Sequence, residues 1–529
     1  MLRRKFGRKR HTFASSRSQD FTLGHGGPLS DSLQVNEMWV KETLGGSGDL
    51  VVRRIRIGSL SQLEAAVLYI DGLVDIQSVQ NFIMEPLMQH FRQMDAGQPS
   101  SGPELLTFLQ DAVLTAGDIQ SVMDFAALVQ ALMSGNAILL ANGISQGLAI
   151  SMQGGEERAV MEPASETLSR GPRESFTENL RTNTAMIRKK IRDPRLWMER
   201  QKIGKVTHTN VVIMYVKGIV NERALEEVRA RLDRIEIDGV LESGYIEELI
   251  QDETYSPFPT IFNTERPDVV AADLLEGRIA ILVDGTPFVL LVPALFIQFF
   301  QSAEDYYHRS DIGSLLRLLR FVSLLIAMFA PSLYIAVTTF HQEMIPSGLL
   351  LSLAAQREGT PFPAFIEAIL MEATLEILRE AGLRMPRGIG QAVSIVGTLV
   401  IGEAAVQAGI VSAAMVIVVS ITAIATFVIP KFNMSISIRM IRFGLMGLAA
   451  SFGLFGIVMG MIVLVLHLSG LRSFGIPYMS SLGPFRRSDL QDVFLRLPRW
   501  AMVNRPRSIV RNNSVRMQTP PPRPPDEES

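Results

Sequence analysis

The feature that most constrains the fold is a stretch of forty-three residues, 388–430, with a single ionisable side chain, Glu403. At a helical rise of about 1.5 Å per residue it spans roughly 65 Å, twice the thickness of a bilayer core. Charges are costly at the centre of a bilayer, so charge-free stretches mark membrane spans. The sequence predicts about four of them, near 321–340, 390–408, 411–430 and 443–466.

Composition agrees with a membrane protein. Hydrophobic residues make up 47% of the 529-residue chain, and its mean hydropathy is +0.22. Neither value is typical of a soluble or a disordered chain of this length. The chain has no cysteine, which excludes disulfides, thiolate zinc sites, cysteine nucleophiles and iron–sulfur clusters.

Charge at the two ends predicts the orientation. Residues 1–48 carry eight Lys/Arg against four Asp/Glu, and residues 472–516 carry nine against two. Positive charge stays on the cytosolic side of a membrane, so both termini are expected there. We expect 1–48 to be a basic disordered tail and 486–529 a basic, proline-rich disordered tail. The four-span order sends the basic turn 431–442 outward, against the rule.

Two apolar segments do not fit simple spans. Residues 287–302 are short and interrupted by Pro293, which favours an interfacial or re-entrant element within the membrane domain 291–485. Residues 341–388 predict an amphipathic helical insertion, with helices near 346–357 and 362–381. In the second helix the glutamates are expected to face water or a partner subunit.

The N-terminal half predicts two tandem α/β lobes, 49–152 and 205–290, each with a mixed or parallel sheet between helices. The pair AAVLYIDGLVD (65–75) and VVIMYVKGIVN (211–221) aligns Tyr69 with Tyr215 and Gly72 with Gly218. A second pair, GNAILLANG (135–143) and GRIAILVDG (277–285), has nearly the same offset. Strands near 65–71, 136–141, 211–216 and 278–283 are expected inside their sheets, because they are apolar without alternation.

The connection 153–204 is expected to be a linker followed by a basic helix, 175–192. Two tandem lobes form a cleft that could bind a ligand, although lobes that merely pack together would leave the same pattern. No residue is singled out for a ligand.

No motif predicts catalysis. The sequence lacks a GxGxxG after a strand, a Walker loop and HExxH, and its seven histidines are scattered. Carboxylate pairs such as Glu247-Glu248 are most simply solvated. We expect no enzyme, no cofactor, no metal and no nucleic-acid partner.

Glu403 is the candidate residue for an ion path. At helical spacing Glu403, Val406 and Gln407 share one broad face, while Ala404 and Ala408 lie on another that suits helix packing. In a ring of subunits the first face would place carboxylates next to an apolar constriction at Val406. The alternative is a protonated or hydrogen-bonded Glu403 that joins two helices, through Ser394 or Gln407.

Small residues mark a packing site in the last span. Gly456 and Gly460 form a GxxxG, and Gly453 precedes them by three residues. Such spacing lets a neighbouring helix approach closely.

Several long strings of the sequence are specific enough to indicate a family. In the first half they are GPRESFTENLRTN (171–183), IDGVLESGYIEELIQD (237–252), SPFPTIFNTERPD (256–268) and ILVDGTPFVLLVP (281–293). In the second half they are HQEMIPSGLLLSLAAQREGTPFP (341–363), EILREAGLRMPRGIGQAVSIVG (376–397) and SAAMVIVVSITAI (412–424). Together these strings resemble the GerA (A-subunit) family of spore germination proteins.

The resemblance implies a polytopic protein of the endospore inner membrane. It implies an A-subunit of a nutrient germinant receptor, acting with a second polytopic subunit and a lipoprotein subunit. It further implies a homo-oligomeric, ligand-gated cation channel in contact with membrane lipids. Alternative interpretations are a paralogue linked to dipicolinate release, a secondary transporter and a non-conducting membrane scaffold.

Overall fold

The computed structural model describes residues 27–57, 63–90, 103–154, 162–163, 165–385, 401–483, 492–510 and 513–522. The chain divides into two compact units. The first comprises residues 1–155 and 192–198, and the second comprises 156–191 and 199–529. Each unit is described by itself.

The first unit is built on a five-stranded sheet with the order β1-β2-β4-β5-β3, and all four strand pairings are antiparallel. Its strands are β1 (Leu50–Ile57), β2 (Leu63–Ile70), β3 (Ile119–Val122), β4 (Asn136–Ala141) and β5 (Gly147–Ser151). Its helices are α1 (Leu33–Thr43), α2 (Ile76–Val79), α3 (Glu85–His90), α4 (Pro103–Phe108) and α5 (Phe125–Met133), with the π-helical turns Gln80–Met84 and Leu109–Val113.

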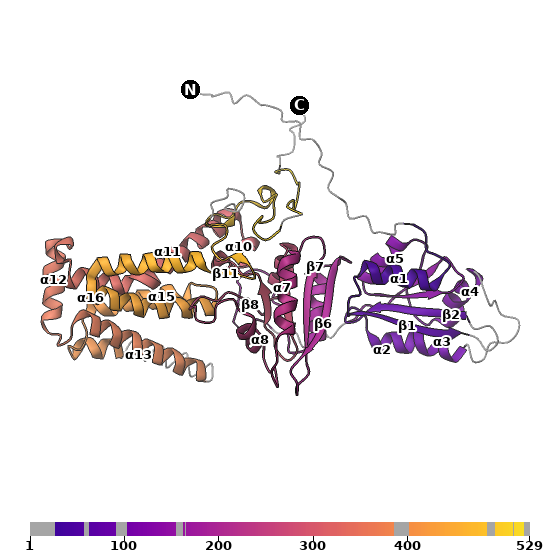
Figure 1. Cartoon of the computed structure of the whole chain (residues 1–529), viewed down its shortest axis with the longest axis horizontal. Coiled ribbons are helices and arrows are strands. Elements are labelled where there is room, and N and C mark those ends of the chain that lie inside the picture. Colours follow the sequence, from indigo (N-terminus) through magenta and orange to yellow (C-terminus); the bar gives the residue numbers. More distant parts are fainter. Residues whose placement is uncertain are drawn as a thin grey trace, which may run out of the picture. The chain divides into compact units, whose positions relative to one another are not determined.

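Helices cover both faces of this sheet, as Figure 1 shows for α1 and α5 on one side and α2 and α3 on the other. On β2, Ala65 and Val67 pack into one core with α4, while Ala66 and Leu68 pack into a second core with α5. A strand buried on both faces needs apolar side chains at every position. This explains the unbroken apolar runs of β2 and β4.

A second lobe, here called lobe 2, belongs to the second unit except for the first three residues of β6, and its five-stranded sheet has the order β6-β7-β9-β10-β8. Its strands are β6 (Leu196–Ile203), β7 (Thr209–Val216), β8 (Phe262–Thr264), β9 (Ile279–Val283) and β10 (Val289–Val292). Its helices are α6 (Leu180–Lys190), α7 (Glu222–Asp233), α8 (Ser243–Ile250) and α9 (Pro267–Leu275). The pairings β7–β9, β9–β10 and β10–β8 are antiparallel.

The prediction of internal strands is confirmed, since β2, β4, β7 and β9 each have a neighbour on both sides. The prediction of a mixed or parallel sheet is wrong for the first sheet, and the three pairings described for lobe 2 are antiparallel as well. That prediction followed from alternating strand-like and helix-like segments, but helices can also cover both faces of an antiparallel sheet.

Some predicted boundaries are also wrong. Residues 33–43, placed in the disordered tail 1–48, form α1, whose Leu33 and Val40 lie in the core of the first sheet. Lobe 2 begins before residue 205, with α6 and β6. The predicted basic helix is α6, but it buries Arg188 instead of exposing it to solvent.

Residues 287–302 belong to lobe 2, so an interfacial or re-entrant element is wrong. Here β10 joins the sheet, and a 3₁₀ helix (Phe296–Phe300) buries Phe299 against Phe262, with ring centroids 5.4 Å apart. The apolar residues of this segment fill a protein core.

The rest of the second unit is a bundle of apolar helices (Figure 1). The elements of this part are α10 (Glu304–Tyr307), α11 (Ser310–Thr339), a 3₁₀ turn (Gln342–Met344), α12 (Ser347–Glu358), α13 (Ala364–Arg384), α15 (Ala413–Phe427) and α16 (Phe432–Gly470). Of the predicted span 390–408, residues 401–407 are helical and residues 390–400 lie outside the described residues. Two described helices, α11 and α16, are long and apolar enough to cross a membrane.

The chain reverses direction inside α16, so a single span at 443–466 is wrong. Gly453 has φ 61° and ψ −141°, a conformation that only glycine adopts readily. On the two legs, Ser437 Oγ donates to Pro257 O while His467 Nε2 lies 2.9 Å from Ser256 Oγ, so both legs reach the same edge of lobe 2. The reversal itself lies beside Phe340, at the far end of α11.

The helix near 362–381 exists as α13, but the expected exposure is wrong for two of its glutamates. Glu367 and Glu372 are buried with 0% and 1% of their surface exposed, whereas Glu380 is exposed as expected. Glu372 pairs with Arg442 on α16 at 3.0 Å, and Glu367 accepts a hydrogen bond from the Ser412 N–H at 2.9 Å. The side of α13 that faces the bundle therefore carries both charged and apolar residues, while Ile377 is 68% exposed on the outer side.

The C-terminal segment packs against the second unit, so a disordered tail is wrong for the described residues 492–510 and 513–517. It contains a 3₁₀ turn (Arg499–Ala501). The short strands β11 (Arg472–Ser473) and β12 (Ile476–Pro477) precede this segment. Asp492 pairs with Arg317 of α11 at 2.8 Å, and Arg516 pairs with Glu276 next to α9. Composition alone could not predict these partly buried ion pairs.

Candidate functional site

A cavity of about 630 Å³ lies where lobe 2 meets the bundle, and we call it the junction cavity. Its walls come from segments far apart in sequence: residues 165–166, α8, α13 and the turn between α15 and α16. The fold brings them together because α13, α15 and the first leg of α16 all have an end next to lobe 2.

The lobe wall of the junction cavity is acidic. Glu242 precedes α8, and its Oε2 accepts from the Gly244 N–H at 2.5 Å while its Oε1 accepts from Thr286 Oγ1 at 3.0 Å. Glu247 lies further along α8 and accepts from Asn263 Nδ2 at 3.3 Å. Within the described residues neither carboxylate has a salt-bridge partner.

The environment of Glu247 favours its neutral form. Burial raises the pKa of the Glu247 carboxyl to about 7, assisted by the charge of Glu242 and opposed by the hydrogen bond from Asn263. Near neutral pH this carboxyl is therefore poised between its two protonation states.

Lys431 joins the turn before α16 to lobe 2. Its Nζ lies 2.5 Å from Glu166 Oε1, donates to the Asn263 carbonyl at 3.1 Å and lies 4.2 Å from the centroid of the Phe262 ring. The side chain is almost fully buried by these contacts. They give lobe 2 and the bundle a fixed ionic connection beside the cavity.

The helical wall of the cavity is basic. Arg379 of α13 and Arg439 of α16 both contact the same carboxylate, Glu376, and the Arg379 Nη1 lies 3.3 Å from it. One carboxylate therefore serves two guanidinium groups. The cavity has an unpaired acid on one wall and a surplus of positive charge on the other.

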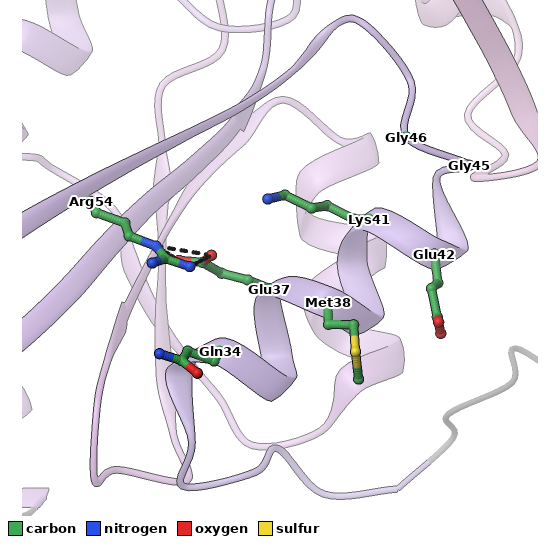
Figure 2. A pocket seen from close by; sticks show the side chains of 8 residues that line it. All are labelled: Gln34, Glu37, Met38, Lys41, Glu42, Gly45, Gly46 and Arg54. Atoms are coloured by element: carbon green, nitrogen blue, oxygen red, sulfur yellow. Dashed lines mark hydrogen bonds and ion pairs between the residues drawn. The ribbon is translucent and has the colours of Figure 1, made fainter.

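The first unit has a shallower pocket, of about 510 Å³, formed by α1 and β1 (Figure 2). Its buried acid, Glu37, is bound by Arg54 through Nη2 at 2.7 Å and Nε at 3.1 Å, as the dashed lines in Figure 2 show. Because this carboxylate already has a two-point partner, the pocket offers a ligand less free charge than the junction cavity does.

The predicted ion-path residues lie on the helical segment 401–407. Glu403 and Gln407 are exposed on the single chain, and Gln407 Nε2 donates to Glu403 Oε1 at 3.1 Å. Val406 is half-buried and packs with the core of the bundle. Ala404 and Ala408, expected to pack against neighbouring helices, are exposed in the chain, and Gly402 is buried beside Val416 instead.

The three glycines of the predicted packing site lie at the reversal of α16 and just after it. A Cβ on Gly460 would lie 2.7 Å from Leu445 Cδ2, and one on Gly456 would collide with the Leu448 carbonyl. A Cβ on Gly453 would lie 2.7 Å from His341 Cε1. The small residues here let the second leg of α16 lie against the first.

The junction cavity itself was not predicted, because Glu247 was taken as solvated. Helical spacing gives the missing signal: Glu247 lies four residues after Ser243 and three before Ile250, and both of these are buried. The described residues contain no group of three or more His, Asp and Glu side chains that could hold a metal ion.

Fold and site together define a chain that joins a two-sheet half to apolar helices long enough to cross a membrane, with a ligand-sized cavity where lobe 2 meets them. The model of the family described as Bacillus/Clostridium GerA spore germination protein matches residues 38–508. The chain belongs to this family.

Three similar proteins support this membership. The chain is 50% identical to "Spore germination protein KA" of Bacillus subtilis (strain 168), over 92% of this chain and 88% of that protein. It is 46% identical to the "Uncharacterized membrane protein YfkQ" of the same organism, over 92% and 93%. It is 38% identical to "Spore germination protein GerLA" of Bacillus cereus, over 90% and 95%.

Among solved structures, the chain is similar to the N-terminal domain of the A subunit of the Bacillus megaterium spore germinant receptor GerK3. The two share 44% sequence identity over 51% of this chain and 98% of that one, with a TM-score of 0.41.

Proposed function

We propose that this chain is the A-subunit of a nutrient germinant receptor in the inner membrane of the endospore, and that it is not an enzyme. Membership of the family supports a role in germination. The proposed partners are a second polytopic subunit, a lipoprotein subunit, membrane lipids and further copies of this chain.

The observation that carries the membrane part of the proposal is the orientation of α13. Two of its glutamates, Glu367 and Glu372, are held inside the bundle, while Ile366, Leu370 and Ile377 point outward. A helix in water would have the opposite arrangement, whereas a helix in lipid must keep its charges inside. The exposed isoleucines and phenylalanines of α15 and α16 support the same conclusion.

The reversal at Gly453 supports a cytosolic orientation for lobe 2. It returns the chain so that Lys431, Arg439 and the C-terminal segment all lie at the lobe 2 end of the bundle. The basic turn that the four-span order sent outward is then on the same side as lobe 2, in agreement with the positive-inside rule. We place both termini in the cytosol.

We further propose that the two sheets are copies of one tandem lobe. The strand orders correspond one to one. The Leu33 N–H donates to Asn142 Oδ1 at 3.1 Å, and the Leu180 N–H donates to Asp284 Oδ1 at 3.3 Å, at corresponding places in the two lobes. Gly143 and Gly285 have φ of 85° and 87°. Chance does not readily produce the same side-chain contact twice.

The ion path is the finer part of the proposal. A carboxylate exposed on the outside of an apolar bundle is costly in lipid, so Glu403 needs water or a neighbouring subunit. In a ring of chains, the face with Glu403 and Gln407 would line a cation path, and Val406 beside it would form the apolar constriction. In the competing interpretation, Glu403 is a structural residue that is stabilised by its hydrogen bond from Gln407 and does not contact ions.

Fractionation and spore physiology test the proposal. Spores that lack this chain should lose the response to the nutrients its receptor detects, while germination by a non-nutrient trigger stays normal. The chain should remain in the membrane pellet after a carbonate wash. A dipicolinate-linked paralogue would instead leave nutrient sensing intact and slow dipicolinate release. Release of the chain by the wash would contradict the proposal.

A further inference from the structure

The junction cavity opens where the apolar helices end. Phe427 at the end of α15 and Phe432 at the start of α16 both line it, and they remain 73% and 55% exposed. On the proposed membrane placement, on which this inference rests, these rings lie at the boundary between hydrocarbon and headgroups, where aromatic side chains are favoured. The cavity is therefore within reach of a lipid headgroup.

The two walls of the junction cavity would bind groups of opposite charge, and the acidic wall suits a cation. Glu247 lines the cavity and accepts a hydrogen bond from the amide of Asn263, and Glu242 and the ring of Phe288 line the same side. An ammonium group would supply the missing cation for Glu247, and an aromatic ring nearby would favour it further.

The opposite wall suits an anion. Arg379 and Arg439 share Glu376, so their guanidinium groups keep N–H donors for a further acceptor. Guanidinium donors match the geometry of phosphate oxygens. Lys431, neutralised by Glu166, adds no free charge to either wall.

We propose that the junction cavity binds a zwitterionic phosphate–ammonium group, the headgroup of an aminophospholipid, with the ammonium at Glu247 and the phosphate at Arg379 and Arg439. The exposed phenylalanines at the entrance favour a lipid over a free solute, because they would contact its first acyl carbons. A lipid held there would contact lobe 2 and the bundle at once.

Lipid retention by the full-length protein tests this proposal. The wild type and variants are reconstituted in nanodiscs with equal amounts of phosphatidylethanolamine and phosphatidylglycerol, re-extracted in mild detergent, and analysed for bound lipid by native mass spectrometry. Glu247→Gln keeps the shape of the side chain and the contact with Asn263. We expect it to lower retained phosphatidylethanolamine at least fivefold and to leave phosphatidylglycerol unchanged.

Two further variants separate the walls. Arg379→Gln should lower retention of both lipids. Arg379→Lys keeps the positive charge, so it should retain more lipid than Arg379→Gln and serves as the test if Arg379→Gln fails to fold. Glu248→Gln, on the exposed side of the same helix, is the matched control and should retain lipid like the wild type. Equal retention of phosphatidylethanolamine by Glu247→Gln and the wild type would overturn the proposal.

A free-ligand arm distinguishes the source of the headgroup. If water-soluble phosphoethanolamine protects the detergent-solubilised protein thermally in a Glu247-dependent way while no lipid is retained, the lipid source is overturned. Failure of the membrane proposal would look different, since the carbonate wash would then release wild type and variants alike.

Discussion

At the scale of single residues, Glu247 makes stability depend on pH. Its pKa in the folded chain, about 7, lies above the ordinary value of a glutamate, so folding favours the protonated carboxyl. The resulting stabilisation is lost as pH rises from the ordinary glutamate value through about 7. Above that pH the folded state carries a buried, unpaired charge.

We therefore expect Glu247→Gln to raise the melting temperature of the protein at pH 8, by an amount equivalent to about 1 to 3 kcal/mol in the free energy of unfolding. At pH 4.5 the substitution should have little effect. Thermal melts of the purified protein at both pH values measure this. Glu248→Gln should change neither melt. A Glu247→Gln effect of equal size at both pH values would show that the carboxyl is not titrating in this range.

Gly453 is the second residue on which the account depends. With φ at 61° and ψ at −141°, any side chain there is strained, and a Cβ would press on Phe340 and His341. Gly453→Ala should reduce assembled membrane protein severalfold, as measured by quantitative immunoblot of membrane pellets. Gly444→Ala, in the same helix with open space around it, is the control and should assemble normally. Normal assembly of both would contradict the reversal.

At the scale of elements, α13 and α16 are held together by a buried ion pair. Arg442 and Glu372 lie 3.0 Å apart with almost no exposure. Removing one partner leaves an unpaired buried charge, so Arg442→Met should cost about 3 to 5 kcal/mol. The double variant with Glu372→Met should recover most of that loss in thermal melts, because two apolar groups replace the pair. No recovery would mean that Arg442 acts through other contacts.

Elements could be predicted from the sequence where local pattern decides. Strands β2, β4, β7 and β9 and helices α12 and α13 follow from apolar runs, turn residues and prolines. The burial of Glu367 and Glu372 could not, because it depends on Arg442 and the Ser412 N–H, which come from other segments of the bundle. The reversal in α16 was missed because hydropathy is the same on both sides of Gly453 and one backbone dihedral angle decides it.

The site was the hardest part to predict. Glu166, Glu247, Arg379 and Lys431 are spread over more than half of the chain, and their chemistry appears when lobe 2 and the bundle are packed together. Glu403, by contrast, was singled out as a candidate because it is alone in a long apolar stretch, and that depends on sequence only.

At the scale of the whole molecule, the C-terminal segment ties lobe 2 to the first helix of the bundle. Asp492 accepts from Tyr306 OH at 2.5 Å and pairs with the fully buried Arg317 at 2.8 Å. Asp492→Ala should lower the melting temperature by an amount equivalent to about 2 to 4 kcal/mol. Asp311→Ala breaks an exposed pair with Arg309 and should lower the melting temperature much less, because solvent screens such pairs. Equal losses would contradict a buried anchor.

Single-channel recording of the full-length protein in planar bilayers is the sharpest test of the proposed cation path past Glu403. Ionic current carried mainly by monovalent cations is the predicted result for the wild type. Glu403→Gln should weaken the preference for cations over anions, because it removes the ring of carboxylates, and Val406→Ala should raise the leak by widening the constriction. No conductance from correctly inserted wild-type protein, or unchanged conductance in both variants, would contradict the claim.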